Sequence, residues 1–181
     1  MNTKGFIFGQ KVDAVLHRAK CDMLTVKLGT ETSMLRVFIP VAIDANPNLR
    51  FTGKVATALH HAFRSNVTVA MVLPEDIAGG EEAPYLTILD ERVRELKMKI
   101  PHAHVEAKLF HSDYLASGIV KAASGYDVVL LPAARNRLTK AIGVGSIPEQ
   151  VAKNCRRKTV LIAKGYRGIA QPFWEYISER L

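Results

Sequence analysis

The 181-residue sequence lacks several features that define large classes of proteins. It has no run that approaches the roughly 18 consecutive apolar residues of a membrane-spanning helix, and its first residues do not form a secretory signal. It contains only two cysteines, Cys21 and Cys155, whose spacing fits no metal-ligand pattern. These absences predict a soluble protein with reduced thiols in the cytoplasm.

Motifs for catalysis and metal binding are absent too. No paired carboxylates stand out as an acid and a base, and Ser146 has neither a G-x-S-x-G context nor a neighbouring histidine. The histidines form no H-E-x-x-H motif, so we expect them at the surface rather than around a metal ion; they include His60, His61, His102, His104 and His111. The sequence therefore predicts no catalytic residue, no metal site and no enzyme.

Positive charge, in contrast, is abundant and unevenly placed. The formal net charge is +8, and residues 135–164 hold eight lysines and arginines against Glu149 alone. Such a segment is either a solvated basic face or a surface that attracts phosphate, nucleic acid or an acidic membrane. Aromatic residues do not alternate with these charges, as they do where bases stack on a protein, so we expect no nucleic-acid partner.

Apolar runs alternate with helical patterns from residue 34 onward. The expected strands are 34–41, 66–73, 105–110, 128–131 and 159–163, and the expected helices are 50–63, 85–96, 113–122 and the segment after residue 146. Asn46-Pro47-Asn48 is expected to form a turn and a cap, and Asp113 to cap the third helix. Ser146 with Glu149 resembles a capping box. This order predicts an α/β fold with an open, mainly parallel five-stranded sheet and helices on both faces.

A weak internal repeat suggests how the ends of the chain are organised. Residues 9–27 and 145–163 share a glycine, a helix, a basic turn and an apolar strand at an ungapped offset of 136. Residues 1–28 are then a partial helix–strand unit and 34–164 a complete domain, although two unrelated units give the same pattern. Residues 165–181 are expected to form an amphipathic helix that docks on the body or contacts a membrane or partner.

These motifs together resemble the universal stress protein family. Ile39-Pro40-Val41 is similar to the opening strand of that family, and the strand after Asp127, a basic loop and Gly145-Ser146 are similar to its closing signature. The N-terminal piece, Ala19 to Lys27, is similar to the end of a preceding domain of the same kind. The resemblance implies a doubly wound fold over residues 34–164.

The resemblance also implies a nucleotide site that this chain has altered. Nucleotide-binding members carry G-x-x-G, nine residues, then G-[ST]; the last pair falls on Gly145-Ser146, but the first two glycines fall on Pro132 and Arg135. Their acidic residue falls on Ala42, with Asp44 two positions later. We therefore expect a degenerate ATP site and no cofactor. The candidate ligand-binding residues are Arg135, Arg137, Gly145, Ser146 and Ile147. Among them, Arg135 and Arg137 would grip the phosphate of an adenine nucleotide or cyclic dinucleotide by side-chain charge.

The family further implies a role and partners. An opening strand without the acidic residue is similar to members found as cytoplasmic parts of amino-acid permeases, sodium/proton antiporters and cation-chloride cotransporters. The chain is therefore expected to be a regulatory and dimerisation module at the inner face of the membrane; the alternative is a soluble stress-type protein that binds an adenine nucleotide or cyclic dinucleotide. Residues 23–27 and 159–163 are expected to pair with each other in a pseudo-dimer, or with a second copy in a homodimer.

Overall fold

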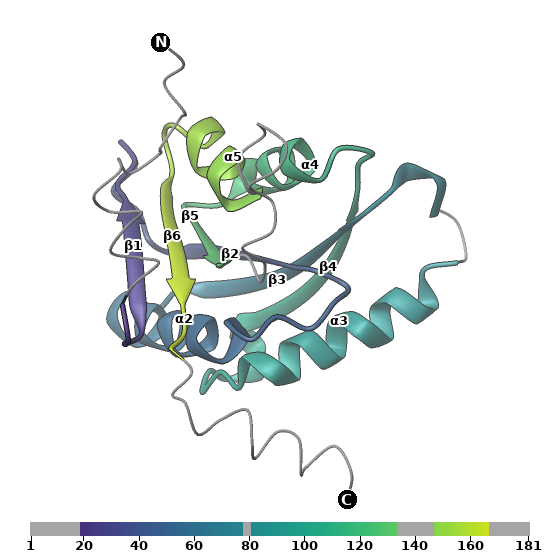
Figure 1. Cartoon of the computed structure of the whole chain (residues 1–181). Coiled ribbons are helices and arrows are strands. Elements are labelled where there is room, and N and C mark those ends of the chain that lie inside the picture. Colours follow the sequence, from purple (N-terminus) through teal and green to yellow (C-terminus); the bar gives the residue numbers. More distant parts are fainter. Residues whose placement is uncertain (1–18, 78–80, 134–146, 167–181) are drawn as a thin grey trace, which may run out of the picture.

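The computed structural model describes residues 19–77, 81–133 and 147–166. Its centre is one six-stranded sheet in the order β1-β6-β5-β2-β3-β4 (Figure 1). Strands β2 to β6 are mutually parallel where they pair, and β1 runs antiparallel to β6. The strands are β1 (Met23–Lys27), β2 (Arg36–Val41), β3 (Asn66–Leu73), β4 (Val105–His111), β5 (Val128–Pro132) and β6 (Thr159–Lys164).

The five parallel strands match the predicted sheet, and the sixth corrects its size. Residues 23–27 join the same sheet as its antiparallel edge strand, so the sheet has six strands and not five. The predicted pairing of this segment with residues 159–163 within one chain is confirmed by the β1–β6 ladder, which places Thr25 opposite Ile162.

In the part of the chain that the structure describes, two helices cover each face of the sheet. The helices α2 (Leu49–Phe63) and α3 (Ala83–Leu96) pack on one face, and α4 (Leu115–Ala122) and α5 (Ile147–Asn154) pack on the other (Figure 1). Short 3-10 turns lie at Glu75–Ile77, His102–His104 and Ala123–Gly125. Within the described ranges, no helix is long and apolar enough to cross a bilayer.

The burial of β5 on both faces explains why its sequence is continuously apolar. Val128 and Leu130 belong to the hydrophobic cluster under α2 and α3, whereas Val129 and Leu131 belong to the cluster under α4 and α5. All four side chains are buried. Each side chain buried in this way contributes about 1.5 to 3 kcal/mol relative to an exposed one, so both faces of β5 require apolar residues.

The helices on one face approach very closely at Gly53. A Cβ atom added at Gly53 in α2 would lie 1.7 Å from the carbonyl oxygen of Leu96, the last residue of α3. Glycine is otherwise unfavourable inside a helix, so its position here reflects the contact with α3.

The predicted cap at Asp113 is wrong. The residue before α4 is Tyr114, in extended conformation, and its helix has no side-chain cap. The Oδ1 atom of Asp113 instead accepts the backbone N–H of Glu75 at 3.3 Å, which links the segments after β3 and β4. Three other expected features, the helix within residues 9–18, the Ser146 cap and the C-terminal amphipathic helix, lie outside the described residues.

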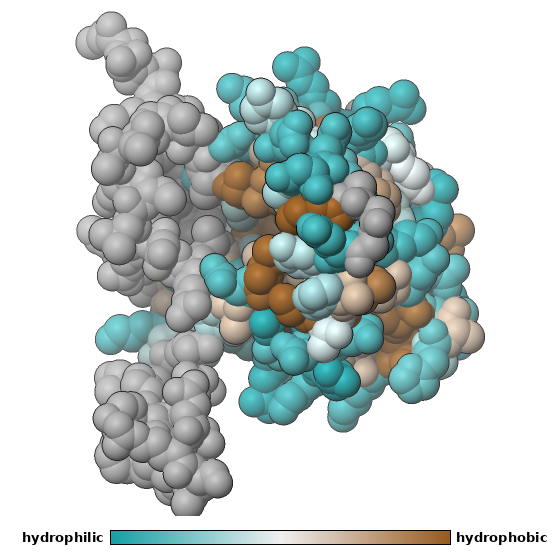
Figure 2. All heavy atoms as spheres, turned by 90° about the vertical axis from the view of Figure 1, so that its right-hand side faces the viewer, coloured by the Kyte–Doolittle hydropathy of each residue, from teal (hydrophilic) through white to brown (hydrophobic). Residues whose placement is uncertain are grey.

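Among the described strands, β4 and β1 form the two edges of the sheet, and their side chains differ in character. Strand β4 forms the edge toward the right of Figure 1, and the view from that side shows mostly hydrophilic residues with hydrophobic residues between them (Figure 2). Strand β1 forms the opposite edge and exposes Leu24 and Val26.

Candidate functional site

The strand order reverses between β2 and β5, and we call the region at the carboxyl ends of these two strands the crevice. From β2 the chain proceeds to β3 and β4 on one side, whereas β5 and β6 lie on the other side, so β2 and β5 flank the point where the order reverses. Ligands of open α/β sheets bind at such a point, outside the carboxyl ends of the strands. Here those ends are Val41 and Pro132.

The carboxyl end of β5 offers no free backbone donor over its described residues. Pro132 has no N–H group. The N–H of the next residue, Ala133, donates to the carbonyl oxygen of Ala163 in β6 at 2.8 Å. The last residue of β5 and the residue after it therefore offer no free N–H to a phosphate oxygen, which binds at such positions through backbone N–H groups.

The carbonyl oxygen of Ala133 is also occupied. It accepts one hydrogen bond from the side-chain amide of Asn46 at 3.1 Å and a second from that of Asn48 at 2.8 Å. Both asparagines lie in the turn between β2 and α2, on the other side of the crevice. The segment after β2 and the segment after β5 are thus bonded to each other at Ala133.

Asn48 holds three segments together. Its side-chain oxygen accepts the backbone N–H of Gly165, just after β6, at 3.0 Å, while its amide bonds to Ala133. Asn48 precedes α2 as predicted, but its side chain caps no helical N–H group; its own N–H instead donates to Asn46 Oδ1 at 2.9 Å. With only 7% of its surface exposed, Asn48 is a buried connector rather than a cap.

A buried arginine of α3 bonds to the segment that follows β2. Arg92 of α3 is 8% exposed, and its Nε atom donates to the carbonyl oxygen of Ile43 at 3.2 Å. Arg92 also pairs with Glu95 one turn later in the same helix. Ala42 and Asp44, which flank Ile43, are exposed. The position of the family's acidic residue, Ala42, therefore carries no charge in this crevice wall.

Comparison with solved structures identifies the fold. A universal stress protein in complex with cAMP aligns with 74% of this chain and 99% of its own, at 18% identity and a TM-score of 0.56. A universal stress protein from Archaeoglobus fulgidus DSM 4304 aligns with 91% of this chain and 59% of its own, at 14% identity and a TM-score of 0.58. The chain has the universal stress protein fold.

The likeness is one of fold and not of sequence. No protein family model and no curated protein matches the sequence. A functionally unknown protein from Pseudomonas aeruginosa PAO1 has a similar structure over 96% of this chain and 62% of its own, at 15% identity and a TM-score of 0.57. This chain thus spans nearly all of one solved structure with the fold and about three fifths of two others.

Most of the site residues predicted from the universal stress resemblance lie outside the described residues. These are Arg135, Arg137, Gly145 and Ser146. Ile147, the fifth, begins α5, is half-buried and packs against the hydrophobic cluster on the α4 and α5 face. The residues that sequence reasoning missed as part of the crevice are Asn46, Asn48 and Arg92, of which only the two asparagines gave a signal, as a turn.

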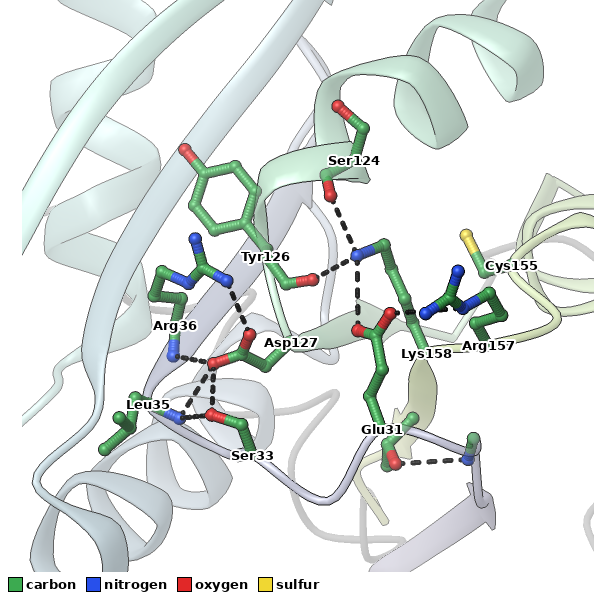
Figure 3. A network of polar contacts seen from close by, with 12 residues as sticks. Glu31, Ser33, Leu35, Arg36, Ser124, Tyr126, Asp127, Cys155, Arg157 and Lys158 are labelled. Carbon is green, nitrogen blue, oxygen red and sulfur yellow. Dashed lines mark hydrogen bonds and ion pairs between the residues drawn. The ribbon is translucent and has the colours of Figure 1, made fainter.

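At the amino ends of the parallel strands, away from the crevice, a polar network surrounds the start of β5 (Figure 3). Asp127 accepts hydrogen bonds from the Ser33 hydroxyl, the N–H groups of Leu35 and Arg36, and the Arg36 guanidinium. Burial alone would raise the pKa of Asp127, but the bonds from Arg36 and Ser33 outweigh it and hold the pKa below its usual value. This network fastens the linker before β2 to the sheet.

Lysine and arginine side chains in the same region form hydrogen bonds and ion pairs within the fold. Lys158 donates to the carbonyl oxygens of Ser124, at 2.9 Å, and Tyr126, and lies 3.6 Å from Glu31 (Figure 3). The Nε atom of Arg157 lies 3.5 Å from the same glutamate. Part of the predicted basic segment therefore holds the linker in place.

The histidines and Cys155 form structural contacts. The prediction of surface histidines is wrong for His60, which is 4% exposed; its Nδ1 atom donates to the carbonyl oxygen of Ser65 at 2.8 Å, and its ring lies 4.9 Å from that of His104. Cys155 is buried, and burial raises the pKa of its thiol despite Lys158 and Lys27 nearby. In the part of the chain that the structure describes, no three histidine, cysteine or acidic residues are placed to hold a metal ion.

Proposed function

We propose that this chain is a non-catalytic regulatory and dimerisation module of universal stress type whose nucleotide crevice no longer cradles a polyphosphate. The observation that carries the proposal is the carboxyl end of β5, where Pro132 has no N–H and the N–H of Ala133 is bonded to Ala163. A phosphate group would have to displace the hydrogen bond between Ala133 and Ala163 before it could bind the backbone N–H of Ala133.

The asparagine contacts support the same proposal. Asn46 and Asn48 bond to the carbonyl oxygen of Ala133 from across the crevice. They tether the first residue after β5 to the turn before α2, so opening the crevice for a nucleotide would break two further hydrogen bonds. A scaffold role requires that the segments after β2 and β5 keep one relative position, and these two hydrogen bonds hold them in it.

Isothermal titration calorimetry with ATP and AMP tests the proposal. We expect no saturable heat for either nucleotide at concentrations up to about 1 mM, where a dissociation constant corresponds to roughly 4 kcal/mol of binding free energy. Micromolar binding of ATP to the wild-type chain would contradict the proposal.

A second candidate function is favoured by one comparison. The solved universal stress protein that aligns over 74% of this chain is in complex with cAMP. By analogy, Arg135 and Arg137 would replace the missing backbone donors and hold the phosphate of a cyclic nucleotide or cyclic dinucleotide, with Gly145, Ser146 and Ile147 beside it. A single cyclic phosphate requires fewer donors than a triphosphate does.

Calorimetry with cAMP and a cyclic dinucleotide separates the two candidates. Saturable binding that is lost in Arg135→Ala and kept in Arg94→Ala, a change to an exposed arginine of α3, would establish the second function and overturn the first. Absence of heat with every ligand favours the scaffold role.

The finer part of the proposal is the partner. We propose that the module is a cytoplasmic domain of, or a partner to, a membrane transporter, on the ground that Ile39-Pro40-Val41 is followed by Ala42 and not by an acidic residue. The measurement is detection of the native protein by antibody in fractionated cells. We expect it in the membrane fraction and, after mild detergent, in a complex with a membrane protein. Recovery only as a free chain in the soluble fraction would contradict this part.

A further inference from the structure

The two ends of the sheet carry opposite charge. The described residues that lead into the parallel strands hold seven lysines and arginines against two carboxylates, Glu31 and Asp127. The described residues that follow these strands, together with residues 19–22 ahead of β1, hold seven carboxylates against Lys20 alone. We call the first set the amino pole; it lies where the arrows of β5 and β6 start in Figure 1 and comprises residues 28–36, 64–66, 97–104, 123–127 and 155–158.

Hydrogen bonds show that segments of the amino pole lie side by side. The N–H groups of Thr30 and Glu31 donate to the carbonyl oxygen of Arg157 at 2.9 and 3.1 Å. The carbonyl oxygen of Leu35 accepts the N–H of Asn66 at 2.7 Å. The linker before β2 therefore crosses this end of the sheet, from the residues that precede β6 to those that precede β3, and joins them in one surface.

Positive charge at this surface exceeds what its carboxylates neutralise. Arg36 lies 2.9 Å from Asp127, and the Nε atom of Arg157 lies 3.5 Å from Glu31 (Figure 3). The side chains of these two arginines are still 60% and 80% exposed. Further exposed cations of the amino pole are Arg64, Lys97, Lys99 and Arg156.

Two of these cations occupy positions that favour glycine. Among the described residues, Arg64 and Lys97 are the two non-glycine residues with positive φ, at 56° and 48°. Each follows the last residue of a helix, α2 or α3, where glycine adopts the left-handed conformation without strain. A cation near a helix carboxyl end is favourable, which offsets part of the strain. That both strained positions carry a charge exposed to water points to a use for that charge.

Large apolar side chains are exposed beside the cations. Leu35 precedes Arg36 and is 56% exposed, and Phe63 precedes Arg64 and is 47% exposed. A nucleic-acid backbone would attract the cations but offers no apolar layer to leucine. The surface of an anionic bilayer offers both, because its headgroups attract lysine and arginine and its interfacial layer takes up apolar side chains.

We propose that the amino pole binds the surface of a bilayer that contains anionic phospholipids, with Leu35 and Phe63 in the interfacial layer. In this orientation the carboxyl ends of β2 and β5 face away from the membrane, because they lie at the opposite end of the sheet. The acidic segments at that end are then far from the anionic lipid. The proposed function gives the chain a membrane-protein partner and no lipid-binding surface, so this inference goes beyond it and does not depend on it.

Cosedimentation of the full chain with protein-free vesicles tests the proposal. The chain should bind vesicles of phosphatidylcholine with about one third phosphatidylserine and should not bind vesicles of phosphatidylcholine alone. Binding should weaken as the salt concentration rises above about 0.15 M. The double variant Arg64→Gly with Lys97→Gly should bind the anionic vesicles roughly 25-fold more weakly, at about 5-fold for each cation removed.

The glycine variant also separates binding from folding. Glycine relieves the strain at both positions, which offsets the lost attraction between each cation and its helix end. The midpoint of urea unfolding should therefore stay close to that of the wild type while binding falls. In a second variant, Leu35→Ser with Phe63→Ser, binding should weaken about 10-fold because apolar area no longer enters the interfacial layer.

Matched controls locate the surface. Lys20→Ala with Arg50→Ala removes two exposed cations near the carboxyl ends of the strands, and Leu86→Ser changes a leucine of α3 that is 46% exposed. Both should leave vesicle binding within about 2-fold of the wild type.

Three results would overturn the proposal. They are no binding of the wild-type chain to anionic vesicles, equal binding to both kinds of vesicle, and binding that persists in both amino-pole variants. Binding of duplex DNA in place of vesicles would assign the surface to nucleic acid and would overturn it too. The vesicles contain neither a transporter nor a nucleotide, so a failure here is distinct from a failure of the proposed function.

Discussion

The side-chain amide of Asn48 donates to the carbonyl oxygen of Ala133 at 2.8 Å across the crevice between β2 and β5. The same side chain accepts the N–H of Gly165 after β6. One buried residue thus joins the turn before α2 to two segments that leave the carboxyl edge of the sheet. In this chain these hydrogen bonds join the turn after β2 to the residue after β5, at the carboxyl ends where an open α/β sheet ordinarily binds its ligand.

Asn48→Ala should destabilise the fold. The change leaves the N–H of Gly165 without this acceptor and removes one of two donors to Ala133, so we expect a loss of about 2 to 3 kcal/mol in the free energy of unfolding. Urea unfolding followed by circular dichroism measures it. Asn154→Ala is the control: this asparagine is exposed at the end of α5, and its replacement should cost less than about 0.5 kcal/mol. Equal losses would show that Asn48 has no special role.

Gly53→Ala should also be destabilising, against the helix propensity of alanine. The new Cβ would lie 1.7 Å from the carbonyl oxygen of Leu96, which forces α2 and α3 apart at a cost of about 1 to 3 kcal/mol. In Gly125→Ala the Cβ would meet nothing within 4 Å, and stability should change by less than about 0.5 kcal/mol. Thermal unfolding of both variants is the measurement. A stabilised Gly53→Ala would mean that the two helices are not in close contact.

Asp127 should make stability depend on pH in acid. Because its pKa is lowered in the folded chain, its contribution is fully present above about pH 4, the unfolded value, and is lost as the pH falls through the lowered folded value. In Asp127→Asn the chain should lose about 2 kcal/mol at neutral pH, and the difference from wild type should shrink below about pH 4. Urea unfolding at a series of pH values measures both curves. Parallel curves down to the lowest pH would refute the role assigned to this carboxylate.

The two cysteines should differ in reactivity. Cys21 is exposed, whereas Cys155 is buried with a raised thiol pKa. Since the thiolate is the reactive form, a chromogenic disulfide reagent should modify Cys21 rapidly and Cys155 only after unfolding. Cys21→Ser should abolish the rapid phase in the folded chain. A rapid phase that survives in this variant would place Cys155 at the surface.

Residues that form the sheet core could be predicted from the sequence, because the requirement there is local. The run from Val128 to Leu131 identifies a strand buried on both faces, and the alternation of such runs with helical patterns identifies the fold class. The pairing of β1 with β6 was one of two alternatives that the family resemblance implied, and its register was not predicted.

The candidate site was predicted less well for a physical reason. Asn48 and its partners Ala133 and Gly165 are 85 and 117 positions apart, and asparagine in a turn gives no indication of what its side chain contacts. Asp113 and His60 show the same limit. Each was assigned from its local pattern, as a cap and as a surface residue, and each contacts a segment or environment that only the packing defines.

The most direct test of the closed crevice is the amide resonance of Ala133 in a 15N-labelled full chain titrated with ATP. The N–H of Ala133 is bonded to Ala163, so we predict slow hydrogen exchange and no saturable change in chemical shift as ATP is added. Hydrogen exchange that is fast in the free chain, or a shift of the Ala133 resonance that saturates with ATP, would contradict the account, because the backbone at the end of β5 would then be open to phosphate.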